Sequence, residues 1–269
     1  MSFANAFANM NKSKKEIFDN NKSSQQPTPS VKKEKEQKEF KPKANIGWLF
    51  YKDYFKDLNY SKLDDSKNED IINKKVNNII NQKFTMQKSK DLGNTKFELS
   101  IIYPGLLIGS GNTHELPDIK GQAILGFHFD YTSGLPEITG SSIKGILRSA
   151  FNNEKYIKEI LDKDDTLNIK KLESEIFDNN DIFFDAIIIK SGKNNKILED
   201  DFITPHKEAT KNPIPLRFIK VLPEVTFEFQ FLLQDGIIKK EQKLNLFKQI
   251  ILDFGLGAKT NVGYGKFQE

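Results

Sequence analysis

The sequence predicts an α+β fold of the ferredoxin-like type, a βαββαβ core with long insertions and an N-terminal helical segment. Three observations favour it. A segment near residue 230 alternates apolar and polar side chains, two segments repeat apolar residues at helical spacing, and stretches rich in Gly and Pro separate them. The same element order underlies RNA-recognition modules, although fold alone does not give function.

Ordered structure is expected to begin at residues 46–51, an aromatic run that contains the single Trp. Residues 52–91 are predicted to be helical, because their isoleucines and valine recur at helical spacing. Phe97 to Tyr103 alternates and suits the first strand, which Pro104 and the following glycine would end. Residues 105–140 are predicted to be long loops with short strands.

The first core helix is expected after Gly140-Ser141-Ser142, with a serine as its N-cap. Its apolar residues fall at i, i+3, i+4, i+7 and i+8 and form one face. They are Ile143, Ile146, Leu147, Ala150 and Phe151.

The second half of the core starts with a predicted strand from Asp181 to Lys190 and a loop over 191–216. Glu224 to Leu233 is the clearest strand, with the side chains of Val225, Phe227, Phe229 and Phe231 on one face and those of Thr226, Glu228 and Gln230 on the other.

The second core helix is predicted over 239–254, with Leu244, Phe247, Ile251 and Phe254 as its buried stripe. Gly255 would end it, and a short strand from Tyr264 to Gln268 would end the core.

Charge divides the chain into a basic tail over 1–43 and a nearly neutral domain over 44–269. The tail has ten Lys and five acidic residues, a net charge of +5, whereas the remainder has 31 Lys or Arg against 32 acids. The tail lacks the apolar residues needed to offset its ordering entropy, so we expect it to be disordered. Any nucleic-acid binding by the domain must therefore depend on local clusters of charge.

The residue inventory excludes several classes of protein. The chain has no Cys, which removes disulfide scaffolds, cysteine–zinc sites and thiol nucleophiles, and its three His leave little room for histidine-rich metal sites. No apolar run reaches the roughly 18 residues of a membrane-spanning helix, and the N-terminus lacks the apolar core of a signal peptide. We expect a soluble cytoplasmic protein with no membrane partner, no metal and no cofactor.

The helix that opens with Gly140 is the first candidate anion site. Ser141 and Ser142 offer hydroxyls and free backbone N–H groups, which suit phosphate. Lys144 and Arg148 are four residues apart and share the face opposite the apolar stripe. A capped helix with a solvated basic face is the equally weighted alternative.

The second candidate is a glycine-rich segment near the C-terminus. Its glycines would let the backbone approach a ligand, and its polar residues would donate to phosphates or sugar hydroxyls. The predicted ligand-contacting residues are Gly255, Gly257, Lys259, Thr260, Asn261, Gly263 and Gly265. A structural glycine turn is the alternative, and the segment is neither a Walker loop nor a dinucleotide fingerprint.

Residues capable of acid–base chemistry are scattered, and no spacing joins them. The set comprises Asp185, Asp200, Asp201, His206, His114 and Glu115. His114 lies in a loop that we expect to be flexible, where it could contact RNA or act as a general base. His206, within Thr204-Pro205-His206, is more easily explained as a structural histidine. No catalytic residue is predicted.

Taken together, these motifs resemble the RAMP superfamily, the repeat-associated proteins of CRISPR effectors. Gly140 to Arg148 is similar to the helix signature of that family, and Gly255–Thr260 with Gly263–Gly265 is similar to its glycine-rich loop. Asp201 with Thr204-Pro205-His206 and the Leu107–His114 loop narrow the resemblance to the sixth Cmr-type subunit family of type III-B complexes.

The resemblance covers residues 45–269 and implies a non-catalytic subunit that binds guide (CRISPR) RNA towards its 3′ side and caps a protein filament in antiviral defence. The implied partners are the guide RNA, the target RNA through the complex, the repeated backbone subunit and the first Cmr-type subunit. Two alternatives stay open. One is a metal-independent endoribonuclease that processes precursor guide RNA with His114, and the other is a small-ligand-binding ferredoxin-like domain.

Overall fold

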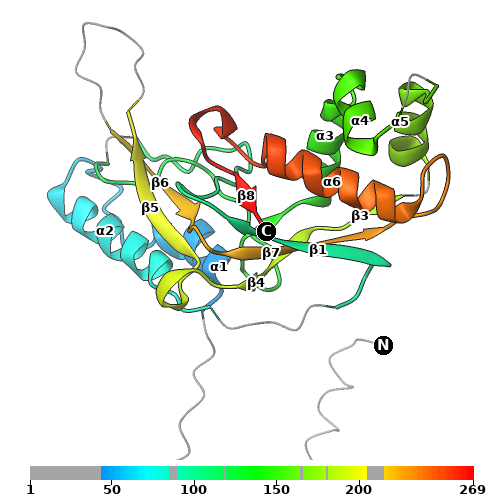
Figure 1. The fold of residues 1–269 in the computed structure, drawn as a ribbon. Helices are drawn as coiled ribbons and strands as arrows, with labels where there is room; N and C mark the ends of the chain where they lie inside the picture. Colours follow the sequence, from blue (N-terminus) through cyan, green and yellow to red (C-terminus); the bar gives the residue numbers. More distant parts are fainter. Residues whose placement is uncertain (1–43, 85–89, 118, 164–165, 180, 205–214) are drawn as a thin grey trace, which may run out of the picture. The chain divides into compact units, whose positions relative to one another are not determined.

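The computed structural model describes residues 44–269, apart from 85–89, 118, 164–165, 180 and 205–214 (Figure 1). The predicted tail over 1–43 and His206 therefore lie outside the described residues. Lys43–Glu269 forms one compact unit. The mixed helix-and-strand class predicted from the sequence is confirmed.

An antiparallel sheet with the strand order β2-β4-β7-β1-β8 forms the centre of this unit, and β3 also pairs with β7. Its strands are β1 (Thr95–Ile101), β2 (Glu137–Ile138), β3 (Ile182–Phe183), β4 (Ala186–Lys190), β7 (Thr226–Leu232) and β8 (Phe267–Gln268). The predicted strand over 181–190 is thus two short strands, because the chain breaks at Phe184 and Asp185.

The central strand β7 is buried on both faces. Phe227, Phe229 and Phe231 are 0% exposed and face the helices, where Phe231 lies 5.4 Å from the Phe247 ring. The opposite face of β7 is polar and also buried, and there the Gln230 side chain accepts from the Leu92 N–H at 2.8 Å and donates to the Lys90 carbonyl. The segment that leads into β1 therefore covers part of the polar face.

Helices α3 (Gly140–Ala150), α4 (Glu154–Leu161), α5 (Ile169–Asp178) and α6 (Lys240–Phe254) lie on the other side of the sheet (Figure 1). The prediction of α3 is confirmed in position, but its N-cap is Thr139 rather than a serine. The predicted stripe of α6 is partly wrong. Leu246 and Ile250 are buried, Leu244 is half-buried and Phe254 is 39% exposed, so the buried face is rotated toward the sheet.

The sequence analysis missed α4, α5 and the hairpin of β5 (Leu198–Ile203) and β6 (Leu216–Val221). Strand β5 contains Asp200 and Asp201, which disfavour strands in an isolated sequence. In the hairpin their carboxylates pair with Arg217 and Lys220 of β6. These partners are about 20 residues away in sequence, so the compensation is not visible locally.

The N-terminal segment forms a separate layer of α1 (Ile46–Tyr51), η2 (Asp53–Phe55) and α2 (Ser66–Ile80), so the predicted helix over 52–91 is confirmed only in part. Lys75 of α2 pairs with Asp53 at 2.9 Å and Asp57 at 3.2 Å, which holds η2 against α2. Within the described ranges, no helix combines the length and apolarity that crossing a membrane requires.

A buried ion pair joins α6 to the start of β3 and yields a stability prediction. Lys243 Nζ lies 2.8 Å from Asp181 Oδ2, and both side chains are 2% exposed. Lys243→Met should lower the free energy of unfolding by about 3–5 kcal/mol, because it leaves a buried carboxylate without its cation. Adding Asp181→Asn should recover part of the loss. Urea unfolding of both variants measures this, and a single variant as stable as the wild type would contradict it.

Candidate functional site

The glycine-rich loop is closed on the protein's own backbone. Gly257 and Gly265 have φ values of +85° and +69°, and Cβ atoms added there would lie 2.3 Å from the Leu107 carbonyl oxygen and 1.8 Å from the Leu256 carbonyl oxygen. The Gly265 N–H donates to the Gly105 carbonyl at 2.8 Å. These glycines are required for internal packing, so the prediction that they approach a ligand is wrong for Gly257 and Gly265.

Gly255 and Gly263 complete the loop in two different ways. Gly255 has a φ of +78°, and a Cβ there would lie 2.4 Å from the Gly265 carbonyl oxygen, so it too is needed for internal closure. Gly263 has a φ of +96° with Pro104 as its nearest neighbour at 3.5 Å. Gly255 and Gly265 are buried, whereas Gly263 is half-buried and Gly257 is exposed.

The outer side of the loop is an exposed tip around η4 (Thr260–Val262). Lys259 and Asn261 are exposed, Thr260 is half-buried and Val262 is 64% exposed. Tyr103, which precedes the neighbouring Pro104, is 83% exposed. The tip thus presents an ammonium, an amide and an aromatic ring, and Lys259 forms no ion pair with any described residue.

The tip is anchored by a hydrogen-bonded junction of Tyr264, Asp201 and Lys220. Tyr264 Oη donates to Asp201 Oδ2 at 2.8 Å, and Lys220 Nζ donates to the same oxygen at 2.7 Å. Burial opposes the charge on Asp201, but the hydrogen bonds from Lys220, the Phe202 N–H and Tyr264 outweigh it and hold the pKa below its usual value. Burial and the Asp201 carboxylate together raise the pKa of Tyr264. Two motifs far apart in sequence therefore meet here.

The N-terminus of α3 is occupied by a carboxylate of the protein itself. The Gly140 N–H donates to Asp185 Oδ1 at 2.6 Å, and the Ser142 N–H donates to the Thr139 hydroxyl. Close by, burial raises the pKa of Glu137; the hydrogen bond from His128 opposes this, and repulsion from Asp185 and Asp130 adds to it. An external phosphate would meet negative charge here, so the predicted anion site at Ser141 and Ser142 is contradicted.

The two predicted cations of α3 are not a free pair. Arg148 bonds Glu173 at 2.9 Å and Asp178 at 3.0 Å and so ties α3 to α5. Lys144 is half-buried, with its ammonium 5.8 Å from the centre of the Phe183 ring. The Arg148 guanidinium therefore serves as a structural clamp, and contact of this exposed side chain with RNA stays a prediction.

His114 does not lie in a flexible loop. It is 4% exposed, its Nε2 lies 2.7 Å from the Phe50 carbonyl, its Nδ1 lies 3.1 Å from the Ala123 carbonyl, and its ring stacks on Phe50 at 3.7 Å. Burial lowers its pKa, although the hydrogen bonds to the two carbonyls oppose this. His114 is a structural residue, which corrects its prediction as an RNA contact.

The remaining acid–base candidates are kept apart. Asp200 pairs with Arg217, Asp201 belongs to the junction, and Asp185 caps α3. All three nitrogens of the Arg217 guanidinium have partners in the protein, since Nη1 also donates to Asn73 and to the Gly121 carbonyl. No cluster of His and carboxylates in the described part of the chain could hold a metal ion.

The helix-free face of the sheet does not provide the aromatic platform of an RNA-recognition module. Its central positions are Lys96, Glu98, Glu228 and Gln230, and Lys96 forms an ion pair with Glu228 at 3.2 Å. Paired charges and carboxylates replace the stacking rings there. The sheet face is therefore unlike that of an RNA-recognition module.

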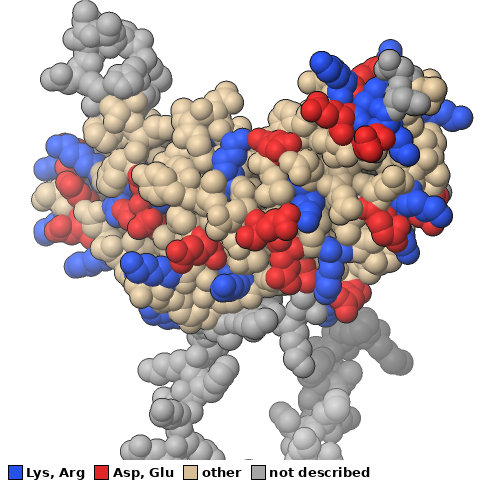
Figure 2. Space-filling model, viewed as in Figure 1, with Lys and Arg blue, Asp and Glu red and all other residues tan. Residues whose placement is uncertain are grey.

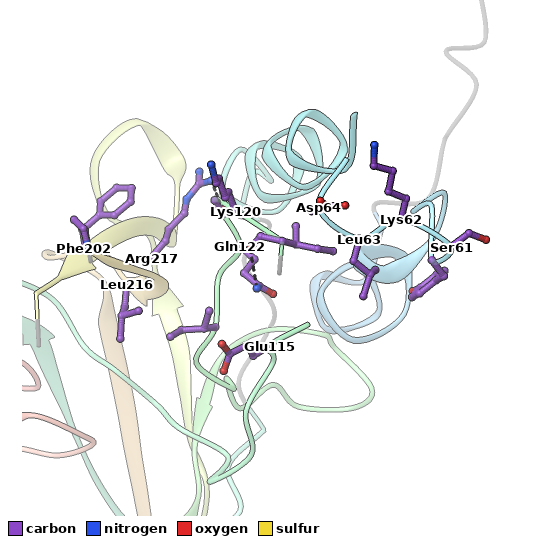
Figure 3. Close-up of a pocket in the computed structure, with 15 residues that line it drawn as sticks. Ser61, Lys62, Leu63, Asp64, Glu115, Lys120, Gln122, Phe202, Leu216 and Arg217 are labelled. Atoms are coloured by element: carbon purple, nitrogen blue, oxygen red, sulfur yellow. Dashed lines mark hydrogen bonds between the residues drawn. The ribbon is translucent and has the colours of Figure 1, made fainter. Parts of the chain in front are cut away.

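A hollow of about 1110 Å³ lies between the β5–β6 hairpin and the segment before α2 and was not anticipated from the sequence. Figure 3 shows Phe202 and Leu216 on one side and Ser61 to Asp64 on the other. Its charged lining is mixed, with Lys62, Lys120 and Arg217 against Asp64 and Glu115, and Arg217 is already paired with Asp200. The hollow therefore has no clear preference for an anion or a cation.

The junction generates a pH-dependent prediction. Because the folded pKa of Asp201 is lowered, its stabilisation is full above the unfolded value, roughly pH 4, and is lost as pH falls through the folded value. Asp201→Asn should cost about 3 kcal/mol near neutral pH by leaving Lys220 without its closest partner. It should also lose less stability than the wild type on acidification. Urea unfolding across pH measures both, and parallel pH profiles would contradict the assignment.

Comparisons with known proteins bear on this architecture. A family model described as the RAMP superfamily matches residues 98–268. The chain is 32% identical over 148 residues to the CRISPR system CMR subunit Cmr6 of Saccharolobus solfataricus, covering 53% of this chain and 48% of the relative. It is 32% identical over 151 residues to Cmr6 of Pyrococcus furiosus, covering 50% and 42%. The chain thus spans about half the length of these relatives.

Among solved structures, the chain is similar to a chain of the type III-B Cmr-beta complex bound to cognate target RNA. The TM-score is 0.49 and the identity 30%, over 64% of this chain and 57% of the other. Since the family model matches more than half of the chain, from within β1 through both core helices to the glycine-rich loop, the chain belongs to the RAMP superfamily.

Proposed function

We propose that this protein is a non-catalytic subunit of a type III-B, Cmr-type CRISPR–Cas effector complex, which binds guide RNA towards its 3′ side and caps the backbone filament. The family match and the two Cmr6 relatives support the assignment to a complex of this kind. Its partners would be the repeated backbone subunit, the first Cmr-type subunit and, through the complex, the target RNA.

A ferredoxin-like core is part of the proposal. The elements β1, α3, β4, β7, α6 and β8 follow the βαββαβ order, and their four strands are arranged as β4-β7-β1-β8 with antiparallel neighbours. This is the order expected when two βαβ halves interleave. The hairpin of β5 and β6 is inserted between the second and third core strands.

The RNA-binding proposal rests on one observation. The tip is exposed, and the glycine-rich loop that bears it is held in place by contacts with the protein's own backbone. Lys259 and Asn261 are exposed on a backbone that the glycines and the Tyr264–Asp201 hydrogen bond fix in place. A fixed ammonium and amide can hold a phosphate or a sugar hydroxyl without reading sequence, and an exposed ring such as Tyr103 can stack on a base.

The absence of catalysis is also proposed rather than demonstrated. A processing ribonuclease would need a group that moves a proton at the scissile 2′-hydroxyl. His114 cannot take this role from its observed position, because its ring is buried and both of its nitrogens face backbone carbonyls. This arrangement disfavours the endoribonuclease alternative.

The tip is tested by Lys259→Ala together with Asn261→Ala. The double variant of the full-length protein should bind guide RNA about tenfold more weakly, with a smaller salt dependence, because a phosphate contact is lost. Filter binding across salt concentrations measures this. Lys170→Ala with Asn152→Ala is a matched control, because it also removes one exposed ammonium and one exposed amide. Equal affinities for the tip variant and this control would refute the RNA-binding role of the tip.

Membership of the complex is tested separately by reconstitution. The tip variant and the wild type should both co-purify with the backbone subunit and the first Cmr-type subunit, because the tip is proposed to hold RNA rather than protein. Wild-type protein that fails to join these subunits would refute the proposed complex while leaving RNA binding by the tip unaffected.

Catalysis is tested with wild type and His114→Ala on precursor guide RNA, in magnesium and in chelator. Neither protein should cut RNA. The variant should lose about 2–4 kcal/mol of stability, since it removes a buried ring and two hydrogen-bond partners. Multiple-turnover cleavage that disappears in the variant would overturn the non-catalytic proposal.

A further inference from the structure

A second basic surface lies away from the glycine-rich loop, where the end of α2 meets the turn after β4. Figure 2 shows blue side chains at the lower left, near this turn. We call it the lysine turn, and define it as Asn81, Lys83, Lys190, Lys193, Asn194, Asn195 and Lys196.

The lysine turn is built by hydrogen bonds between two segments more than 100 residues apart. Lys83 Nζ donates to the Asn194 carbonyl at 2.9 Å, and Lys196 Nζ donates to Asn81 Oδ1 at 2.6 Å. The backbone N–H of Phe84 donates to the Asn195 carbonyl at 3.0 Å. These bonds hold the segment of Lys83 against the segment that contains Lys193 and Lys196.

Its positive charge is not neutralised internally. The sequence has no Asp or Glu over 71–84 or over 186–198, although residues 44–269 as a whole carry a net charge of −1. Within the described ranges, none of the four lysines forms an ion pair. Two exposed carboxylates flank these segments, namely Glu199 and Glu224. Glu224 follows Pro223, whose carbonyl packs against Gly192 beside the turn.

The chemistry of the lysine turn suits a polyphosphate backbone. Ammonium groups neutralise phosphates. The side-chain amides of Asn81 and Asn195 already donate to the Asn77 and Phe84 carbonyls, so the lysines supply the groups that would contact RNA. A protein interface would be expected to carry a buried aromatic or aliphatic anchor, yet no large exposed hydrophobic residue belongs to this turn. The observations therefore favour RNA over an acidic protein.

The lysine turn and the tip share one end of the main sheet. Lys190 at the end of β4 pairs with Thr226, Thr226 pairs with Ser100 of β1, and β1 leads into Gly105, on which the glycine-rich loop is closed. Two strand spacings, roughly 10 Å, thus separate the strands that lead to the two surfaces. In Figure 1 the glycine-rich loop lies above the sheet and the turn after β4 lies below it, so one RNA strand would pass around this end of the sheet to contact both.

We propose that the lysine turn is a second RNA-backbone site, which holds phosphates of the same single strand that the tip engages. This rests on the proposed RNA-binding function and adds to it a defined surface. Phosphate contacts carry no sequence information, so binding at this site should be independent of base sequence.

The test compares full-length wild type with a Lys83→Ala, Lys190→Ala, Lys193→Ala triple variant. Single-stranded RNA of unrelated sequence is the probe, and affinity is measured by fluorescence polarisation across salt. The triple variant should bind about tenfold more weakly, with the slope of log affinity against log salt reduced by about 2, since each single-strand phosphate contact contributes roughly 0.7. The control triple Lys163→Ala, Lys170→Ala, Lys171→Ala makes the same charge change elsewhere.

A second variant gains charge without removing a contact. Glu224→Lys should tighten RNA binding about threefold, because it extends the positive field between the lysine turn and the tip. The proposal would be overturned if the wild type and the triple variant bound RNA equally well, or if the control triple variant lost as much affinity. It would also be overturned if Glu224→Lys did not tighten binding. So would a polyglutamate peptide that binds as tightly as RNA. Loss of binding by the tip variant alone would leave the proposed function intact and refute the lysine turn.

Discussion

Burial of strand β7 on both faces is the constraint on which the rest of the structure depends. Its three phenylalanines require a helical layer on one side, and α6 with α3 supplies it. Its polar side, with Glu228 and Gln230, is too buried to remain unsatisfied, so the segment before β1 crosses it and forms hydrogen bonds to Gln230. Because this face is occupied, the RNA contacts that we propose lie at the end of the sheet rather than on its surface.

In the glycine-rich loop at that end of the sheet, some residues pack inside the protein and their neighbours in sequence are exposed. The glycines permit backbone contacts that no side chain could tolerate, and the residues between them remain exposed. The Tyr264–Asp201–Lys220 junction fixes the loop to the β5–β6 hairpin. A binding surface on a fixed loop loses less entropy on association than a mobile one, which is how a tip of few residues can contribute measurable affinity.

The cations of this protein have two distinct roles. Arg148 and Arg217 are the only arginines, and both use their planar forks on carboxylates of the protein. Lys259 and the lysines around residue 190 form no ion pairs with described residues. In a domain of almost neutral charge, these unpaired lysines create the local field available to an anionic polymer.

The sequence by itself determined the order of the core elements and the positions of β7, α3 and α6, because their apolar periodicity is local and strong. The tertiary structure decided the site. The burial of His114, the capping of α3 by Asp185 and the pairing of Arg148 all depend on partners far away in sequence. The same is true of the β5–β6 hairpin, since Asp200 and Asp201 become compatible with a strand only when Arg217 and Lys220 lie opposite them. Local patterns record which residues can be charged or buried, but only the folded chain decides which of those charges remain unpaired.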